Sequence, residues 1–331
     1  MSFSRLIADD FVISADSITA GLWTDSNVPT ITTFYTSSNQ AAGSSGDYYL
    51  NVYSDVGLTS LEFASTYGNL AGSGSELYDP AVNGKSYSST IYGSYRTLVL
   101  GDENSAFVFG GISASDFWAI SVDRNRYKES LFPGSLTLVL SGSEGSISLT
   151  DNSQVVTTVL FNDAGRVFQL VSGSAGGVNS TNPNGYSPNQ GSYGWFLPDI
   201  ATLLINPLAV SESIGLTPNR SSNTNGNNPW ELVDAITLGE SFTLNSQETI
   251  TSDFVFCRPR SSEYNYSENP SFISGSTGEV LYSSFINNPT TYITTVGLYN
   301  DTNELLAVAK LSKPLKKDFT KEALVRVKLD F

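Results

Sequence analysis

The sequence predicts a mainly β protein, built of antiparallel β-sandwich or barrel-like domains with long loops and one short helix. Charged residues make up only 15% of the 331 residues, while aromatic residues make up 12%. Ser, Thr, Asn and Gly must therefore supply most of the polar surface, and such a composition favours strands and turns over helices. Short β-rich runs bounded by turn residues recur along most of the chain, which is typical of antiparallel sheets.

The first half of the chain contains a series of strand signals. The runs PTITTFYTS, DYYLNVYSD and SLEFASTYGN are rich in β-branched and aromatic residues. RTLVLGDENSAFVFGG predicts two strands joined by a GDEN turn, and DFWAISVDRNRYKESLFPGSLTLVLSG predicts two strands around a Pro133-Gly134 turn. GSISLTDNSQVVTTVLFNDAGRVFQLVSG predicts a meander with turns at Asp151-Asn152 and NDAG. We therefore expect residues 1–171 to form an N-terminal β domain.

Residues 172–229 have a different composition, because Gly, Ser, Asn and Pro dominate two stretches that flank FLPDIATLLINPLAV. We expect a loop-rich insertion here, with long surface loops around one or two buried apolar segments. Residues 230–331 are expected to form a C-terminal β domain with the one short helix. NNPWELVDAITLGE predicts that helix, since Asn228 can cap it, Pro229 suits its first turn and Gly239 suits its end.

The clearest hairpin signal lies in the C-terminal domain. Residues 292–299 and 304–311 flank NDTN, whose residues tolerate turn geometry. Residues 305–308 are apolar on both faces of the second strand, so we expect that strand to be largely covered. Pro314 is expected to end it.

The terminal run EALVRVKLDF alternates apolar and polar residues, which predicts a half-buried final strand over residues 323–331. Arg326 and Lys328 should face outward. The side chains expected to be buried are Val325, Val327, Leu329 and Phe331.

Composition and charge exclude several classes of function. The net charge of −15 argues against nucleic-acid binding and against an anionic membrane surface. No run of about 18 apolar residues predicts a transmembrane helix. The chain has no histidine, which removes Ser-His-Asp and Cys-His catalysis and all histidine metal sites. Its one cysteine, Cys257, cannot form an internal disulfide and is interpreted as a small buried residue.

Paired carboxylates are the catalytic device that remains, because glycosidases use them. Asp79, Asp102, Glu103 and Asp116 lie in or beside predicted turns without a distinguishing pattern, so we interpret them as solvated turn carboxylates. A calcium loop would suit an acidic β protein, but its spaced Asp/Asn ligand pattern is missing. We therefore predict a non-enzymatic protein with no catalytic residue, cofactor or metal site.

Aromatic side chains in the polar loops suggest contacts with other molecules. NGYSPNQGSYGWF places Tyr186, Tyr193 and Trp195 among turn residues, and Trp230 follows the second loop. Such residues can stack on sugars, pack beneath a loop, or anchor a protein interface, where Tyr and Trp are enriched. These alternatives stay open, and we expect residues 172–229 to lie at a subunit contact.

Basic residues gather at the C-terminus of this acidic chain. Residues 310–331 hold seven basic and three acidic residues, a net charge of +4, which leaves −19 on the remaining 309. The residues Arg124, Arg126 and Lys128 alternate on a predicted strand, which would place them on one face. Either set is a solvated strand edge or a docking surface for an acidic neighbour. At the terminus, the interface candidates are Lys316, Lys317, Arg326 and Lys328.

Five long segments stand in order between about Ser88 and Phe331: SSTIYGSYRTLVLGDEN, DRNRYKESLFPGSLTLVLSG, TDNSQVVTTVLFNDAGRVFQLVSG, SEYNYSENPSF and YITTVGLYNDTNELLAVAKLSKPLKKDFTKEALVRVKLDF. Together they resemble virion structural proteins of T-even-type contractile-tailed phages, particularly those that infect marine cyanobacteria. The resemblance implies a structural role, a location in the virion tail and folding in the host bacterial cytoplasm. It carries over no catalytic residue.

We therefore expect a non-enzymatic structural subunit of a contractile phage tail, at the baseplate or tail periphery, that packs in a symmetric assembly. Its expected partners are other tail or baseplate proteins and further copies of itself, without nucleic acid or membrane. The alternative is a receptor- or glycan-binding module on the virion surface.

Overall fold

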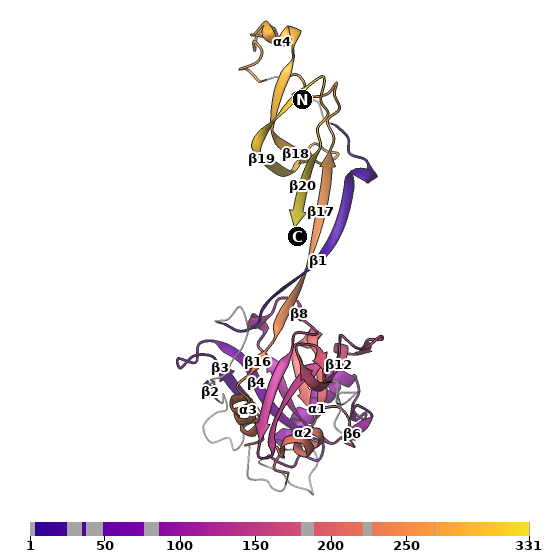
Figure 1. Cartoon of the computed structure of the whole chain (residues 1–331), viewed down its shortest axis with the longest axis vertical. Helices are drawn as coiled ribbons and strands as arrows, with labels where there is room; N and C mark the ends of the chain where they lie inside the picture. Colours follow the sequence, from indigo (N-terminus) through magenta and orange to yellow (C-terminus); the bar gives the residue numbers. More distant parts are fainter. Residues whose placement is uncertain are drawn as a thin grey trace. The chain divides into compact units, whose positions relative to one another are not determined.

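The computed structural model describes residues 4–24, 35–37, 49–75, 86–179, 189–220, 227–267 and 269–330, with the backbone alone for 35–37. The chain divides into two compact units. Unit 1 combines Met1–Ser17 with Thr249–Phe331, and unit 2 is Ile18–Glu248. Strands dominate both units, so the predicted mainly β, antiparallel fold is confirmed (Figure 1).

The boundaries of these two units differ from the predicted domain boundaries. The expected boundaries after residues 171 and 229 fall inside unit 2. The segment 172–229 is not a loop-rich insertion in its described part, because it contributes strands to the central sheet and a helix to the core. Its apolar run FLPDIATLLINPLAV is the reason, since this run fills both faces of that sheet.

Twelve of the described strands of unit 2 form one antiparallel sheet. Strands β11 (Leu160–Asn162) and β13 (Gly177–Val178) pair with one of its members, β12. The order of the other ten is β16 (Phe242–Thr243), β9 (Thr137–Gly142), β10 (Gly145–Asp151), β12 (Gly165–Ser174), β14 (Gly194–Leu197), β15 (Thr202–Ile205), β7 (Asp116–Val122), β4 (Leu61–Asn69), β3 (Leu50–Tyr53) and β2 (Tyr35–Ser37).

Central strands of this sheet are buried on both faces. In β7, Trp118 and Ile120 enter one hydrophobic cluster, while Phe117 enters the other. Strand β15 repeats this alternation, because Leu203 joins the first cluster and Leu204 the second. The sequence signal is a continuous apolar run, as in DFWAISV and TLLI, which indicates a strand covered on both sides.

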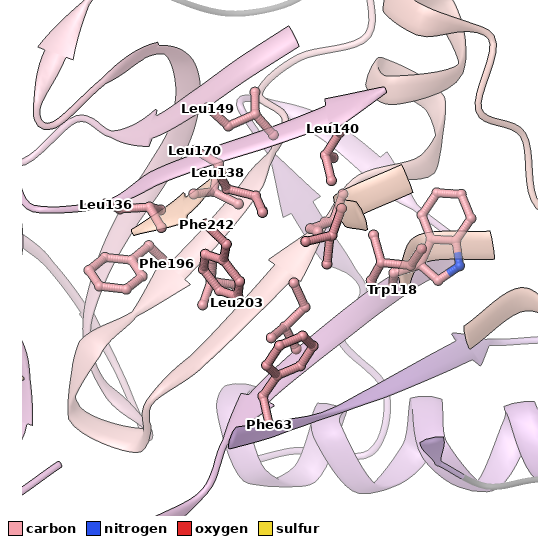
Figure 2. Packing of buried hydrophobic residues seen from close by; sticks show 14 of the residues in the cluster. Phe63, Trp118, Leu136, Leu138, Leu140, Leu149, Leu170, Phe196, Leu203 and Phe242 are labelled. Carbon is pink, nitrogen blue, oxygen red and sulfur yellow. The ribbon is translucent and has the colours of Figure 1, made fainter. Parts of the chain in front are cut away.

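The first cluster lies between the sheet and two helices, α2 (Pro207–Ile214) and α3 (Asn228–Gly239). Aromatic and leucine side chains interdigitate there (Figure 2). Helix α3 is the one that the sequence predicts, with Pro229 in its first turn. Helix α2 begins after Asn206, whose side chain accepts a hydrogen bond from Leu208 N, and ends at Gly215 with φ 71°.

The second cluster lies beneath helix α1 (Tyr87–Leu100) and the hairpin of β5 (Phe107–Phe109) and β6 (Ile112–Ala114). The sequence predicted a strand for Arg96–Leu100, and this is wrong. Ile91 and Tyr95 stand four residues apart on the face that packs on the sheet, and Gly101 ends the helix in the left-handed conformation. Packing of this face outweighs the β-propensity of its Tyr, Thr and Val residues. One predicted helix was therefore too few, since the structure describes four α-helices.

In unit 1, β17 (Asn245–Cys257) lies between β1 (Phe11–Gly21) and β20 (Val325–Asp330). In unit 2, the start of β17 pairs with β8 (Ser130–Leu131). The final strand is confirmed over Val325–Asp330, because Val325 and Val327 are buried while Arg326 and Lys328 are exposed. It begins two residues later than predicted. Leu329 is half-buried, and Phe331 lies outside the described residues.

Unit 1 also holds the predicted hairpin, formed by β18 (Thr290–Tyr299) and β19 (Leu305–Asp318), and the short helix α4 (Ser284–Asn287). Two expectations for it are wrong. Pro314 does not end the second strand, because a register shift opposite Ile293–Thr295 accommodates the missing N–H. Leu305, Leu306 and Val308 are exposed rather than covered.

Candidate assembly surface and binding groove

Unit 1 has a small core and a large apolar surface. In its described part, the hydrophobic side chains that are nearly fully buried are Val255, Val325 and Val327. Large hydrophobic residues on its strands are instead exposed, among them Phe11, Ile13, Tyr292, Leu305, Leu306 and Val308. Contiguous exposed apolar surface is typical of interaction sites, which makes unit 1 a candidate assembly surface.

The exposed end of the hairpin is the densest part of this surface. Leu306 is 68% exposed and Val308 is 59% exposed. They stand two residues apart on β19, so their side chains leave the strand on the same side. We refer to Leu306 and Val308 as the hairpin patch.

Two strand edges of unit 1 are open within the described residues. Strands β1 and β20 lie on opposite sides of β17, and each has β17 as its partner in the sheet. The β1 side carries the exposed acidic residues Asp9 and Asp16. On β20 the exposed side chains of Arg326 and Lys328, here called the β20 basic pair, lie 5.3 Å and 5.9 Å from the centroid of the Phe254 ring. Lys328 Nζ also lies 2.9 Å from Asp330 Oδ1 on the same strand, so β20 holds two basic residues and one acidic residue, a net charge of +1. The two edges therefore still carry net charge of opposite sign.

The other two basic residues predicted at the terminus, Lys316 and Lys317, differ from each other in burial. Lys316 is about half exposed, and its Nζ lies 3.9 Å from Asp318 Oδ2. Lys317 is fully buried, so its assignment to an outward docking surface is wrong. Its Nζ donates hydrogen bonds to Ser261 O (3.0 Å), Asn265 Oδ1 (2.8 Å) and Asp318 O (3.1 Å). Three neutral acceptors thus replace the water that this ammonium group loses.

The second predicted basic cluster does not lie on a strand. Arg124 and Arg126 belong to the 3-10 turn η2 (Arg124–Arg126), because the Asp123 side chain caps it by accepting from Asn125 N. Arg124 lies over the Tyr127 ring, 4.6 Å from its centroid. The nearest carboxylates are those of Glu62 for Arg126, at 3.7 Å, and of Glu248 for Lys128, also at 3.7 Å. These side chains serve contacts within unit 2, and the structure does not gather them on one strand face.

The predicted aromatic anchors mostly lie in the core. Tyr193 and Trp195 are 5% and 8% exposed, one in each hydrophobic cluster, so their placement in surface loops is wrong. Strand β14 carries Trp195 into the sheet. Trp230, in α3, is 40% exposed and keeps an accessible ring. Tyr186 lies outside the described residues.

One of the acidic residues considered for catalysis is buried in an ion pair. Asp116 Oδ2 accepts hydrogen bonds from Tyr67 Oη (2.8 Å) and from Arg220 Nε (2.6 Å). Burial, and then the Asp116 charge, raise the pKa of Tyr67 well above its usual range. Asp102 accepts from backbone N–H groups of its own turn, which holds its pKa low together with the Ser105 hydroxyl. Asp79 lies outside the described residues. Glu103 is exposed beside Asp102, whereas the interpretation of Asp116 as a solvated turn carboxylate is wrong, because it is a buried residue of β7.

Unit 2 contains an open groove of about 480 Å³ between the β5–β6 hairpin and the β11–β12 pair. None of its lining residues is charged. The Phe161 ring stands at its rim and is 72% exposed. Trp195 forms part of its wall, with its ring centroid 5.8 Å from Phe107 and 5.4 Å from Phe109.

Three amide side chains line this groove, and each uses its oxygen on a backbone N–H. Asn152 Oδ1 accepts from Gln169 N (2.9 Å), and Gln169 Oε1 accepts from Gly110 N (3.2 Å). Asn162 Oδ1 accepts from Ala164 N (2.9 Å). These bonds fix the orientation of each amide, which leaves its nitrogen directed elsewhere. The sequence analysis did not identify the groove, because its residues come from segments that are distant in the chain.

No protein-family model matches this chain, and comparisons with curated proteins and with solved structures give no match either. Among the described helices, none is long and apolar enough to cross a membrane. No three His, Cys, Asp or Glu side chains of the described residues lie in a group that could hold a metal ion. The site is therefore defined by the geometry of this chain alone.

Proposed function

We propose that this protein is a non-enzymatic structural subunit that assembles with other copies of itself through unit 1. The observation that carries the proposal is the imbalance of unit 1, whose described core holds three nearly buried valines while its strands expose large apolar residues. Covering one large apolar side chain contributes roughly 1.5–3 kcal/mol. A neighbouring subunit that covers several of them provides the burial that unit 1 lacks alone.

Charge and strand edges favour a second copy as the neighbour. The acidic edge at β1 and the basic edge at β20 are complementary and lie on opposite sides of the same small sheet. A copy that presents its β1 side to the β20 side of the next copy forms a head-to-tail contact. Such contacts close into rings when the rotation between copies allows it. Backbone groups at the two open edges can pair across this contact.

A place in a contractile phage tail, at the baseplate or tail periphery, is the setting we propose for this assembly. The resemblance of the five segments between about Ser88 and Phe331 to virion structural proteins supports it. A head-to-tail ring also suits a tail, whose parts repeat around one axis. Mass spectrometry of purified tail particles should detect the chain in a fixed ratio to the other tail proteins. Its absence from washed particles would refute this placement.

Sedimentation velocity of the purified chain tests the self-assembly directly. We expect one discrete oligomer at micromolar concentration in moderate salt. The double substitution Leu306→Lys and Val308→Lys should shift it to monomer, because two charges then enter the apolar contact. The matched control is Leu98→Lys with Leu238→Lys, two exposed leucines of unit 2.

The control pair should leave the oligomer unchanged. A wild-type protein that stays monomeric at 100-fold higher concentration would contradict the proposal. So would a hairpin-patch variant that sediments as the wild type does. Circular dichroism of each variant separates loss of assembly from loss of fold.

A further inference from the structure

The groove of unit 2 has a chemistry that assembly through unit 1 does not use. Its lining residues come from unit 2 alone, and none of them is charged although the chain carries a net charge of −15. An uncharged groove in an acidic protein disfavours both anionic ligands and ligands that need a carboxylate partner. Its volume of about 480 Å³ falls in the range of small-molecule sites, roughly 300–1,000 Å³.

Hydrogen-bond donors are in excess in this groove. The amide nitrogens of Asn152, Gln169 and Asn162 donate no hydrogen bond to any residue that the structure describes. Asn152 is 7% exposed and Asn162 Nδ2 is buried without a partner. A buried polar group without a partner costs about 1–3 kcal/mol. A ligand rich in oxygen acceptors would pair with the amide nitrogens of Asn152 and Gln169, whereas Asn162 Nδ2 has almost no accessible surface.

The groove also offers an aromatic face that nothing in unit 2 covers. Phe161 is held by the pairing of β11 with β12, in which it stands opposite Arg166. Its ring is the most exposed of the groove residues with an aromatic side chain, since Trp195 is largely buried in the wall. An exposed ring beside fixed amide donors suits a ligand with an apolar face and polar edges.

We propose that this groove binds a neutral saccharide. Sugar hydroxyl oxygens accept hydrogen bonds from the amide nitrogens of Asn152 and Gln169, while the C–H face of the ring packs on Phe161. Each of the two features excludes another occupant. A purely apolar segment would leave the amide nitrogens unpaired, and an anionic sugar would find no cation in the lining.

This inference does not depend on the proposed assembly, because the groove and the hairpin patch belong to different units. Sedimentation and sugar binding can therefore fail separately. A monomeric protein that binds sugar would refute the first proposal and support the second.

Saturation-transfer NMR on the full chain provides the test, with methyl glycosides of glucose, galactose, mannose and N-acetylglucosamine as neutral probes. Methyl glucuronide serves as the anionic probe, and N-acetyl-leucine methylamide as the apolar peptide-like probe. We expect at least one neutral glycoside to bind saturably. Neither the anionic probe nor the peptide-like probe should bind. Phe161→Ala should weaken that binding at least about tenfold, and Phe161→Trp should restore or tighten it.

Matched substitutions separate the groove from the rest of the surface. Phe319→Ala removes another exposed phenylalanine, one of unit 1 that is 57% exposed, and should leave the binding unchanged. Asn152→Asp keeps the oxygen that accepts from Gln169 N but replaces the amide donor with a carboxylate oxygen, so it should abolish sugar binding. Asn104→Asp adds the same charge at an exposed turn and should leave sugar binding unchanged. Thermal unfolding of each variant checks the fold.

Three results would overturn the proposal. The first is saturation by none of the neutral glycosides at concentrations of tens of millimolar. The second is a Phe161→Ala variant that binds the glycoside as the wild type does. The third is binding of the peptide-like probe without any sugar, which would make the groove a site for an apolar polypeptide segment.

Discussion

Truncation of Phe242 to alanine should lower the unfolding free energy of unit 2 by about 4 kcal/mol. The Phe242 ring is fully buried (Figure 2). Its centroid lies 4.8 Å from that of Trp23, in an edge-on arrangement, and 5.5 Å from that of Phe63. Replacement of a buried phenylalanine by alanine costs about 3–5 kcal/mol, and each aromatic pair contributes about 0.5–1.5 kcal/mol beyond its area. The loss of two pairs places Phe242→Ala in the upper half of that range.

Thermal unfolding followed by tryptophan fluorescence measures this loss. For a unit of this size, 1 kcal/mol corresponds to about 2–4 °C, so the melting temperature should fall by roughly 8–16 °C. The Trp23 indole should also change its emission, because Nε1 donates to Phe242 O (2.9 Å) beside the emptied space. Leu238→Ala, at a residue that is 69% exposed, should change stability by less than about 0.5 kcal/mol. A loss below about 1 kcal/mol for Phe242→Ala would refute the packing argument.

Three further predictions concern charged groups. Arg166→Gln should cost about 1–2 kcal/mol at pH 7, since Arg166 Nη2 lies 2.6 Å from Asp199 Oδ1. Burial raises the pKa of Asp199, but the hydrogen bonds and charge of Arg166 outweigh it and hold that pKa below its usual value. This stabilisation is complete above the unfolded-state pKa of Asp199 and is lost as the pH falls through its folded-state pKa. The difference in melting temperature between the wild type and Arg166→Gln should therefore shrink below about pH 4. A difference that stays constant with pH would contradict the pairing. Lys317→Ala should cost about 2–3 kcal/mol in urea unfolding, because three buried acceptors lose their donor, whereas Lys316→Ala should cost less than about 0.5 kcal/mol; equal losses would contradict this. Charge reversal of the β20 basic pair should weaken self-association and reverse its salt dependence in sedimentation experiments, because salt then screens a repulsion, without a change in circular dichroism.

The strands were predictable where burial follows the period of the backbone. Arg326 and Lys328 alternate with Val325 and Val327, and the structure places them on opposite faces of β20. The signal is local, because a strand exposes every second residue whatever its partners are. The helix at Asn228–Gly239 was predictable for a similar reason, since its first-turn proline and its final glycine are local signals. The predicted cap is wrong, because Asn228 lies inside the helix and its side-chain nitrogen donates to Gly74 O instead.

What the sequence could not reveal depends on partners distant in the chain. Many residues of helix α1 have a high β-propensity, and packing against β4 determines that the segment is helical. Lys317 resembles its neighbour Lys316 in every local respect, yet Asn265 and Ser261 bury it. The groove likewise combines residues near positions 110, 152, 161 and 195, which no spacing rule connects.

Unit 1 combines an N-terminal segment with a C-terminal segment, and this determines the order in which its strands can pair during synthesis. Strand β1 leaves the ribosome first, but its partner β17 follows only after the whole of unit 2. At about 5–20 residues per second, β1 waits roughly 10–50 s for this partner. During that time it is an unpaired strand with exposed Phe11, Val12 and Ile13, which can pair with other nascent chains. Unit 2 can fold during this interval, and unit 1 must close last, when the C-terminal strands are complete. The proposed assembly surface of unit 1 therefore forms only after β20 has been synthesised.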